Sequence, residues 1–158
     1  MMVEQIAILL ASNGKTVAVA EGSTGGLLGY ILIQAPGASR YFLGGVTAYS
    51  YPVKERVLAI PRGLLEREGS VSREVALAMA RSVRRLCQAD IGLAETGIAG
   101  PGGGTPQKPV GLFYIAISAE GYEVCLERHF AGDREACRRA SAEQAVQLLH
   151  QYLESVGG

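Results

Sequence analysis

Short apolar runs and helical repeats alternate along the first hundred residues of this chain. TVAVA (16–20) and IGLAET (91–96) are predicted as strands, whereas residues 2–12 and the stretch after Ser72 carry apolar side chains at helical spacing. An antiparallel pair is predicted next, from two apolar stretches that flank a Glu-Gly turn at 120–121. This order predicts an α/β protein, a three-layer α/β/α sandwich with a mixed, mostly parallel sheet.

The same patterns place the individual elements. Ser72 and Asp133 are predicted N-caps, because their side chains can accept hydrogen bonds from the first turn of a helix. The predicted strands are 16–20, 41–50, 91–96, 110–118 and 122–130. The predicted helices are 2–12, 27–32, one opened by Pro52, 61–68, one after Ser72 and a last one from about Asp133. That last helix is predicted to bury Ala136, Ala140, Leu149, Tyr152, Leu153 and Val156.

Composition narrows the class of protein. The 158 residues are 48% hydrophobic and 19% charged, and no linker or repeat interrupts them, which predicts one domain over 1–158. Fifteen basic and fifteen acidic residues balance, so we expect no nucleic-acid partner. The three cysteines form no CxxC pair and the N-terminus lacks the basic segment of a signal peptide, so a cytoplasmic location is expected. No apolar run approaches the roughly 20 residues needed to span a bilayer, so no membrane partner is expected.

The motif AEGSTGG (20–26) lies between the first predicted strand and a predicted helix. Ligands of α/β sheets bind beyond the carboxyl ends of strands, where amides at a helix N-terminus favour an anion. Ser23 is therefore a candidate nucleophile or phosphate ligand, and the alternative is that it only caps the helix. The Walker A and GxGxxG patterns are absent. The neighbouring candidates for substrate binding are Thr24, Gly25 and Gly26.

Tyr49 and Lys54 stand five residues apart across a predicted strand–helix junction. A lysine in a dry site can lose its proton near neutral pH and act as a general base for a hydroxyl nucleophile. A tyrosine beside it can orient or relay that proton. The alternative is a surface lysine and a half-buried tyrosine.

A glycine-rich segment, TGIAGPGGGTPQKP (96–109), follows the predicted strand that ends near Thr96. Its backbone amides can cradle a phosphate while a lysine supplies positive charge. A flexible loop without a ligand is the alternative, although loops of this length in compact domains are usually functional or disordered. The candidates for substrate binding here are Thr96, Gly97, Ile98, Ala99, Gly100 and Lys108.

Basic residues also open the last predicted helix. Arg134 lies in its first turn, where a cation is unfavourable for the helix dipole, so an anionic ligand is a candidate partner for it. Solvation of the helix by Arg134 and Arg138 is the alternative. His129 and His150 lack metal-ligand spacing, so we expect no metal site.

Taken together, five blocks of the sequence resemble the C-terminal domain of the CinA (competence/damage-inducible) family. The blocks are AEGSTGG, PGASRYFLGGVTAYSYPVK, GSVSREVALAMA, TGIAGPGGGTPQKPVGLFYIAI and FAGDREACRRA, and they span nearly the whole chain. Members of that family include stand-alone nicotinamide mononucleotide amidases. The resemblance implies hydrolysis of the nicotinamide amide of this nucleotide to nicotinic acid mononucleotide and ammonia, for NAD salvage. It also implies a metal-independent serine amidase without a cofactor, an α/β/α fold and a homo-oligomer, dimer or trimer.

The resemblance assigns roles to individual positions. The family's tyrosine falls on Tyr49, its lysine base on Lys54, and the hydroxyl that meets the substrate on Thr96. Its arginine falls on Arg134, or alternatively on Arg138.

The opening motif departs from the family pattern. The family reads AESCTGG, so Gly22 stands at the position of the nucleophilic serine and Ser23 at that of the cysteine. Three interpretations follow: Ser23 replaces the nucleophile, or the chain is a weak or inactive nucleotide-binding homologue or acts on another substrate, or Thr24 supplies the hydroxyl. We favour the first.

Overall fold

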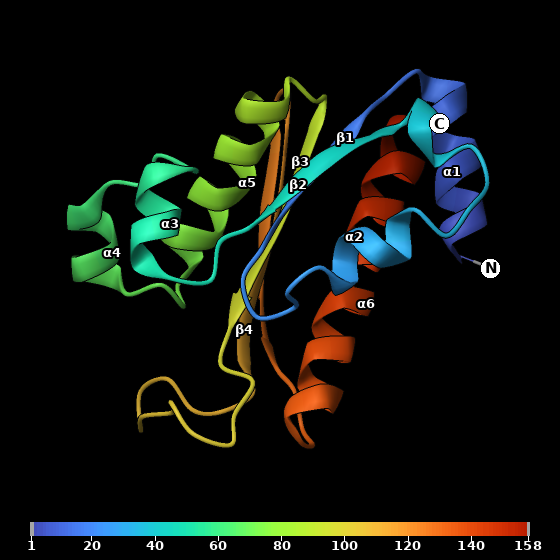
Figure 1. The fold of residues 1–158 in the computed structure, drawn as a ribbon. Helices are drawn as coiled ribbons and strands as arrows, with labels where there is room; N and C mark the ends of the chain where they lie inside the picture. Colours follow the sequence, from blue (N-terminus) through green and yellow to red (C-terminus); the bar gives the residue numbers. More distant parts are fainter. Residues whose placement is uncertain (1, 158) are drawn as a thin grey trace.

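The computed structural model describes residues 2–157, which fold around one five-stranded sheet of order β2-β1-β3-β4-β5 (Figure 1). β1 pairs in parallel with β2 and β3, and β4 is antiparallel to both β3 and β5. Every strand except β4 therefore runs in the same direction, which confirms the predicted mixed sheet. The strands are β1 Val17–Glu21, β2 Phe42–Thr47, β3 Ile91–Gly97, β4 Leu112–Ala119 and β5 Tyr122–His129.

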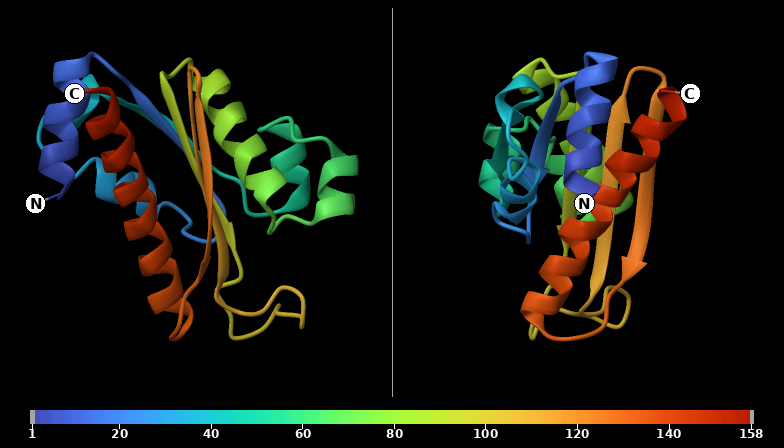
Figure 2. Two further views of the ribbon diagram at one scale, coloured as in Figure 1. Left: turned by 180° about the vertical axis from the view of Figure 1, so that it is seen from behind. Right: turned by 90° about the vertical axis from the view of Figure 1, so that its right-hand side faces the viewer.

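Helices cover both faces of the sheet (Figures 1 and 2). One layer holds α1, α2 and α6, and the opposite layer holds α5 with the short α3 and α4 beyond it. The predicted α/β/α sandwich is confirmed. The helices are α1 Met2–Asn13, α2 Leu27–Leu32, α3 Tyr51–Arg56, α4 Arg62–Glu68, α5 Arg73–Cys87 and α6 Arg134–Val156, with a single 3-10 turn at Ala38–Arg40.

The central strand β1 is buried along its whole length because both its faces meet helices. Val17 and Val19 belong to the cluster under α1, α2 and α6. Ala18 and Ala20 belong to the cluster under α5. α5 approaches the sheet so closely that a Cβ on Gly92 would lie 2.0 Å from the carbonyl oxygen of Ala80. A glycine is therefore required where α5 crosses β3.

Local signals located the helix starts correctly. The Ser72 Oγ accepts a hydrogen bond from the amide of Val75 at 3.3 Å, and Asp133 Oδ1 accepts from Ala136 at 2.9 Å. The buried face of α6 was predicted only in part. Leu149, Tyr152 and Leu153 are buried as expected, whereas Ala136 and Val156 are exposed. Ala140 is only half-buried. Helical periodicity alone therefore assigned Ala136 and Val156 to the core wrongly.

The strand directions bring several loops to one edge of the sheet, the lower edge in Figure 1. β1, β2, β3 and β5 end there, and β4 begins there. The loops that follow those strands, together with the first turn of α6, are consequently neighbours. Within residues 2–157, no helix combines the length and apolarity required to cross a membrane.

Candidate active site

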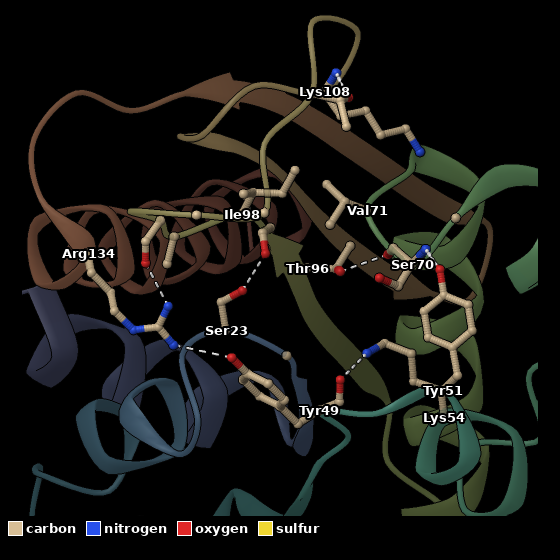
Figure 3. Close-up of a pocket in the computed structure, with 18 residues that line it drawn as sticks. Ser23, Tyr49, Tyr51, Lys54, Ser70, Val71, Thr96, Ile98, Lys108 and Arg134 are labelled. Carbon is tan, nitrogen blue, oxygen red and sulfur yellow. Dashed lines mark hydrogen bonds between the residues drawn. The ribbon is translucent and has the colours of Figure 1, made fainter.

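A cavity of about 380 Å³ opens at the edge where the strands end (Figure 3). Its walls come from the turn after β1, the segment from Tyr49 to Lys54, the loop before α5, the glycine-rich loop and the start of α6. The residues predicted from the sequence that line it are Ser23, Tyr49, Lys54, Thr96, Gly97, Ile98, Ala99, Gly100, Lys108 and Arg134. Thr24, Gly25 and Gly26, also predicted to bind substrate, do not line it.

Glu21, the last residue of β1, explains why the start of α2 is turned away from the cavity. Its Oε1 accepts hydrogen bonds from the amides of Gly26 at 3.1 Å and Leu28 at 2.8 Å, and its Oε2 accepts from Gly29 at 3.1 Å. The Glu21 side chain is buried. The amides at the start of α2 were predicted to bind an anionic ligand. They bind the Glu21 carboxylate instead.

Glu95 in β3 fixes the same turn from the neighbouring strand. Its Oε1 accepts hydrogen bonds from the amides of Gly22 at 2.7 Å and Thr24 at 2.8 Å. Glu95 is fully buried, and this burial raises the pKa of its carboxyl. Neither glutamate was singled out from the sequence. The contacts of Glu95 join positions 73 and 71 residues apart, whereas Glu21 accepts from amides only five to eight residues further along the chain, so only Glu95 lacked a local signal.

Ser23 reaches the cavity but its hydroxyl is already engaged. The Ser23 Oγ donates to the carbonyl oxygen of Gly97 at 2.6 Å. From α6, Arg138 Nε donates to the carbonyl of Ser23 at 2.8 Å and Nη2 to that of Thr24 at 3.1 Å. Arg138 thus braces the backbone of the turn and is not among the cavity-lining residues.

Lys54 is the buried lysine of the site, with a relative exposure of 2%. Its Nζ donates to the carbonyl oxygens of Ala48 at 2.7 Å and Tyr49 at 3.1 Å. Burial lowers the pKa of the Lys54 ammonium, while a negative charge on Glu95 acts in the opposite direction. These hydrogen bonds do not join Lys54 to Ser23, whose hydroxyl points toward the segment of Ile98 (Figure 3).

Arg134 connects two walls of the cavity. Its Nη1 donates to the carbonyl oxygen of Gly100 at 2.8 Å, and its Nη2 donates to the hydroxyl of Tyr49 at 3.2 Å. Tyr49 is 63% exposed, so its ring lies at the mouth of the cavity. Of the two arginines considered from the sequence, Arg134 lines the cavity and Arg138 supports the turn beneath it.

The loop before α5 forms a wall that the sequence analysis did not single out. Thr96 Oγ1 donates to the carbonyl oxygen of Ser70 at 2.7 Å, and the amide of Ser70 donates to the hydroxyl of Tyr51 at 3.1 Å. The Nζ of Lys108 donates to the carbonyl oxygen of Glu68. The block GSVSREVALAMA, which contains this loop, was the available signal.

The described residues contain no group of three or more His, Cys, Asp and Glu side chains placed to hold a metal ion. Each histidine instead lies beside one glutamate. The Nε2 of His129 is 3.2 Å from Oε2 of Glu127, and the Nδ1 of His150 is 2.9 Å from Oε1 of Glu154.

These features first define a class of protein: an α/β/α domain in which strand ends, a glycine-rich loop and the last helix enclose a cavity with a buried lysine. The model of the CinA C-terminal domain matches residues 1–153, and the chain belongs to this family.

Relatives and solved structures agree with this assignment. A CinA-like protein of Desulfotalea psychrophila is 49% identical over 144 residues, which cover 91% of this chain and 35% of the relative. A CinA-like protein of Syntrophomonas wolfei is 45% identical over 152 residues, which cover 96% of this chain and 36% of the relative. The chain therefore spans about a third of the length of these relatives.

Two crystal structures cover almost the whole chain. A competence/damage inducible protein from Agrobacterium tumefaciens superposes with a TM-score of 0.89 at 32% identity, covering 98% of this chain and 96% of that one. A CinA superfamily protein from Klebsiella pneumoniae superposes with a TM-score of 0.93 at 28% identity and the same coverages. The five-stranded α/β fold is therefore that of the CinA superfamily.

Proposed function

We propose that the cavity binds nicotinamide mononucleotide and hydrolyses its carboxamide to a carboxylate and ammonia. The observation that carries the proposal is the position of Lys54, which is buried, has a lowered pKa and faces a cavity that also holds a serine hydroxyl. A neutral amine at this position is a general base for hydroxyl attack on an amide carbon. The resemblance of the chain to nicotinamide mononucleotide amidases supplies the substrate class.

The charge of the cavity suits the phosphate of a nucleotide. Lys108 and Arg134 line it together with the glycine-rich loop, and none of the cavity-lining residues is acidic. The two basic side chains and the backbone amides of the glycine-rich loop favour the binding of a phosphate group. Its volume of about 380 Å³ lies within the range of small-ligand sites.

In the proposed reaction, Ser23 Oγ attacks the carboxamide carbon while neutral Lys54 takes the hydroxyl proton. The C–N bond then breaks, and ammonia leaves with a proton returned by Lys54. Water, deprotonated by the same amine, hydrolyses the acyl-serine and releases the carboxylate. In this reaction the Ser23 hydroxyl must leave the carbonyl of Gly97. The proposal gives Tyr49, which lines the cavity, the role of relaying or orienting the proton.

One observation favours a second function, a nucleotide-binding homologue with weak or no amidase activity. The hydrogen bonds of Ser23 and Lys54 go to different carbonyl groups and not to one another. Gly22, which lines the cavity, carries no side chain that could take the place of Ser23. Under this alternative the cavity binds the nucleotide without turnover.

Ammonia release from nicotinamide mononucleotide tests the proposal directly. Ser23→Ala and Lys54→Ala are each expected to reduce kcat by roughly 10³-fold or more, because each removes a group that acts on the reacting atoms. Arg139→Ala is the control, since Arg139 is exposed and pairs with Glu135 on its own helix. Full turnover by Ser23→Ala would remove Ser23 from the nucleophile role.

Gly22→Ser separates the two functions. Gly22 does not adopt a positive φ, and a Cβ added to it would lie 3.2 Å from the carbonyl oxygen of Glu95 and 3.6 Å from the Cα of Thr96. A serine therefore requires only a slight shift of β3. An active wild type that Gly22→Ser does not improve supports Ser23 as nucleophile. A silent wild type that Gly22→Ser activates supports the binding homologue.

A further inference from the structure

The hydroxyl of Thr24 lies between two buried carboxyl groups. Its Oγ1 is 2.5 Å from Oε1 of Glu21 and 2.8 Å from Oε1 of Glu95. All three side chains are buried, with exposures of 0% for Thr24, 3% for Glu21 and 0% for Glu95. No described side chain other than these two carboxyls approaches the hydroxyl within hydrogen-bonding distance.

If both glutamates are ionised, one proton is available for the two contacts of the Thr24 hydroxyl. A threonine hydroxyl has a single proton and can donate to one oxygen only. An ionised carboxylate only accepts, so the other short oxygen–oxygen contact would have no proton and would be repulsive. A second proton on the Oε1 of one carboxyl converts both contacts into hydrogen bonds, because that Oε1 then donates to Thr24 Oγ1 while Thr24 donates to the Oε1 of the other carboxyl.

The surroundings assign this proton to Glu95 and the negative charge to Glu21. Both oxygens of Glu21 accept backbone amides, three in total, from the start of α2. The Oε2 of Glu95 is buried and has no hydrogen-bond partner. Half of a carboxylate charge on such an atom would be uncompensated, whereas a neutral carboxyl tolerates the position far better.

The charged groups that face Glu95 agree with this assignment. Glu21 approaches from β1, and its negative charge disfavours a second one on Glu95. Lys54 from α3 is the cation that acts electrostatically with Glu95, but it donates its hydrogen bonds to carbonyl groups and not to this carboxyl. Ile115, the pairing partner of Glu95 on β4, is apolar.

We propose that Glu95 is a protonated positioning residue that shares a proton path with Glu21 through Thr24 and leaves Lys54 without a carboxylate counter-ion. As a neutral carboxyl it donates to Thr24 Oγ1 and still accepts the amides of Gly22 and Thr24 beside the cavity. Without a nearby negative charge, the buried Lys54 loses its proton more readily. The proposal concerns the folded chain and does not depend on the proposed amidase activity.

Infrared spectroscopy of the wild-type chain at neutral pH tests the proton directly. We expect the carbonyl stretch of a protonated carboxylic acid, absent from Glu95→Gln and retained in Glu21→Gln and in the surface control Glu143→Gln. A wild-type spectrum without this band would overturn the proposal, and that result requires no variant to fold. A band lost in Glu21→Gln but kept in Glu95→Gln would overturn the assignment to Glu95.

Carbon NMR of the lysine side chains tests by a second route whether Glu95 carries a negative charge. The chain has only three lysines, Lys15, Lys54 and Lys108, so the resonance of Lys54 is assigned by its loss in Lys54→Arg. If Glu95 is already neutral, Glu95→Gln leaves the titration midpoint of Lys54 unchanged. A clear drop of that midpoint in Glu95→Gln would show that Glu95 is a charged partner of Lys54 and would overturn the proposal.

Discussion

Lys54 makes the stability of the chain depend on pH in a direction that can be worked out. Burial lowers its pKa in the folded state below the ordinary 10.5 of the unfolded chain. Between these two values the unfolded chain binds more protons, so the free energy of unfolding rises with pH. The destabilisation caused by burying this ammonium is thus complete below the folded-state pKa and disappears as the pH approaches 10.5.

Comparison of the wild type with Lys54→Met isolates this effect, since methionine is of similar length and does not titrate. We expect the wild type to gain stability relative to the variant as the pH rises from neutral to about 10. Urea unfolding at several pH values measures the difference, and titration of the other groups cancels between the two proteins. A difference that stays constant, or that changes in the opposite direction, would contradict the burial argument.

The contact between α6 and the turn after β1 predicts a long-range role for Arg138. Its guanidinium donates to the carbonyls of Ser23 and Thr24, and removing it leaves both carbonyls without this donor. We expect Arg138→Ala to lower the free energy of unfolding by about 1–3 kcal/mol, as for other hydrogen bonds to charged groups. Turnover in the proposed reaction should fall as well, because a misplacement of about 1 Å at a reacting group can cost roughly 100-fold.

Arg139→Ala is the matched control for this prediction. Arg139 is the next residue of α6, is exposed and pairs with Glu135 one turn earlier. Its removal should change the free energy of unfolding by no more than about 0.5 kcal/mol. If urea unfolding gave the same loss for both variants, the contact of Arg138 with the turn would not be the cause.

At the scale of elements, the sequence was informative wherever the signal is local. The caps at Ser72 and Asp133, the apolar strands and the glycine loop are encoded within a few residues, and the structure places them as predicted. The ends of the buried face of α6 depend on which neighbouring elements cover its first and last turns, and the periodicity of one helix does not report this. Ala136 was misassigned for that reason.

At the site, too, locally encoded features could be predicted and features set by long-range contacts could not. Lys54 and Thr96 could be selected because residue type and position at or after the end of a strand restrict their roles, and both line the cavity. The partners that decide their chemistry could not be selected, since Glu95 meets the turn after β1 only when β1 and β3 pair. The occupation of the α2 amides by Glu21 left Gly26 outside the cavity, although its composition suits a phosphate loop.

At the scale of the whole molecule, a ligand that binds only the folded chain must stabilise it. At a free concentration about 100 times the dissociation constant, one site adds about 2.7 kcal/mol, which raises the Tm of a chain of this size by roughly 5–10 °C. We expect this shift with nicotinamide mononucleotide, increasing with the logarithm of its concentration. Nicotinamide alone, which lacks the phosphate for Lys108 and Arg134, should give a much smaller shift.

Arg134→Ala decides whether the shift arises in the cavity. Arg134 supplies one of its cations and also joins Gly100 to Tyr49, so its loss should weaken nucleotide binding and reduce the Tm shift at a fixed concentration. Arg139→Ala should retain the full shift, because Arg139 does not line the cavity. Equal shifts in the two variants would place the nucleotide elsewhere. Since stabilisation needs no turnover, this measurement detects the nucleotide site whether Ser23 is a nucleophile or not.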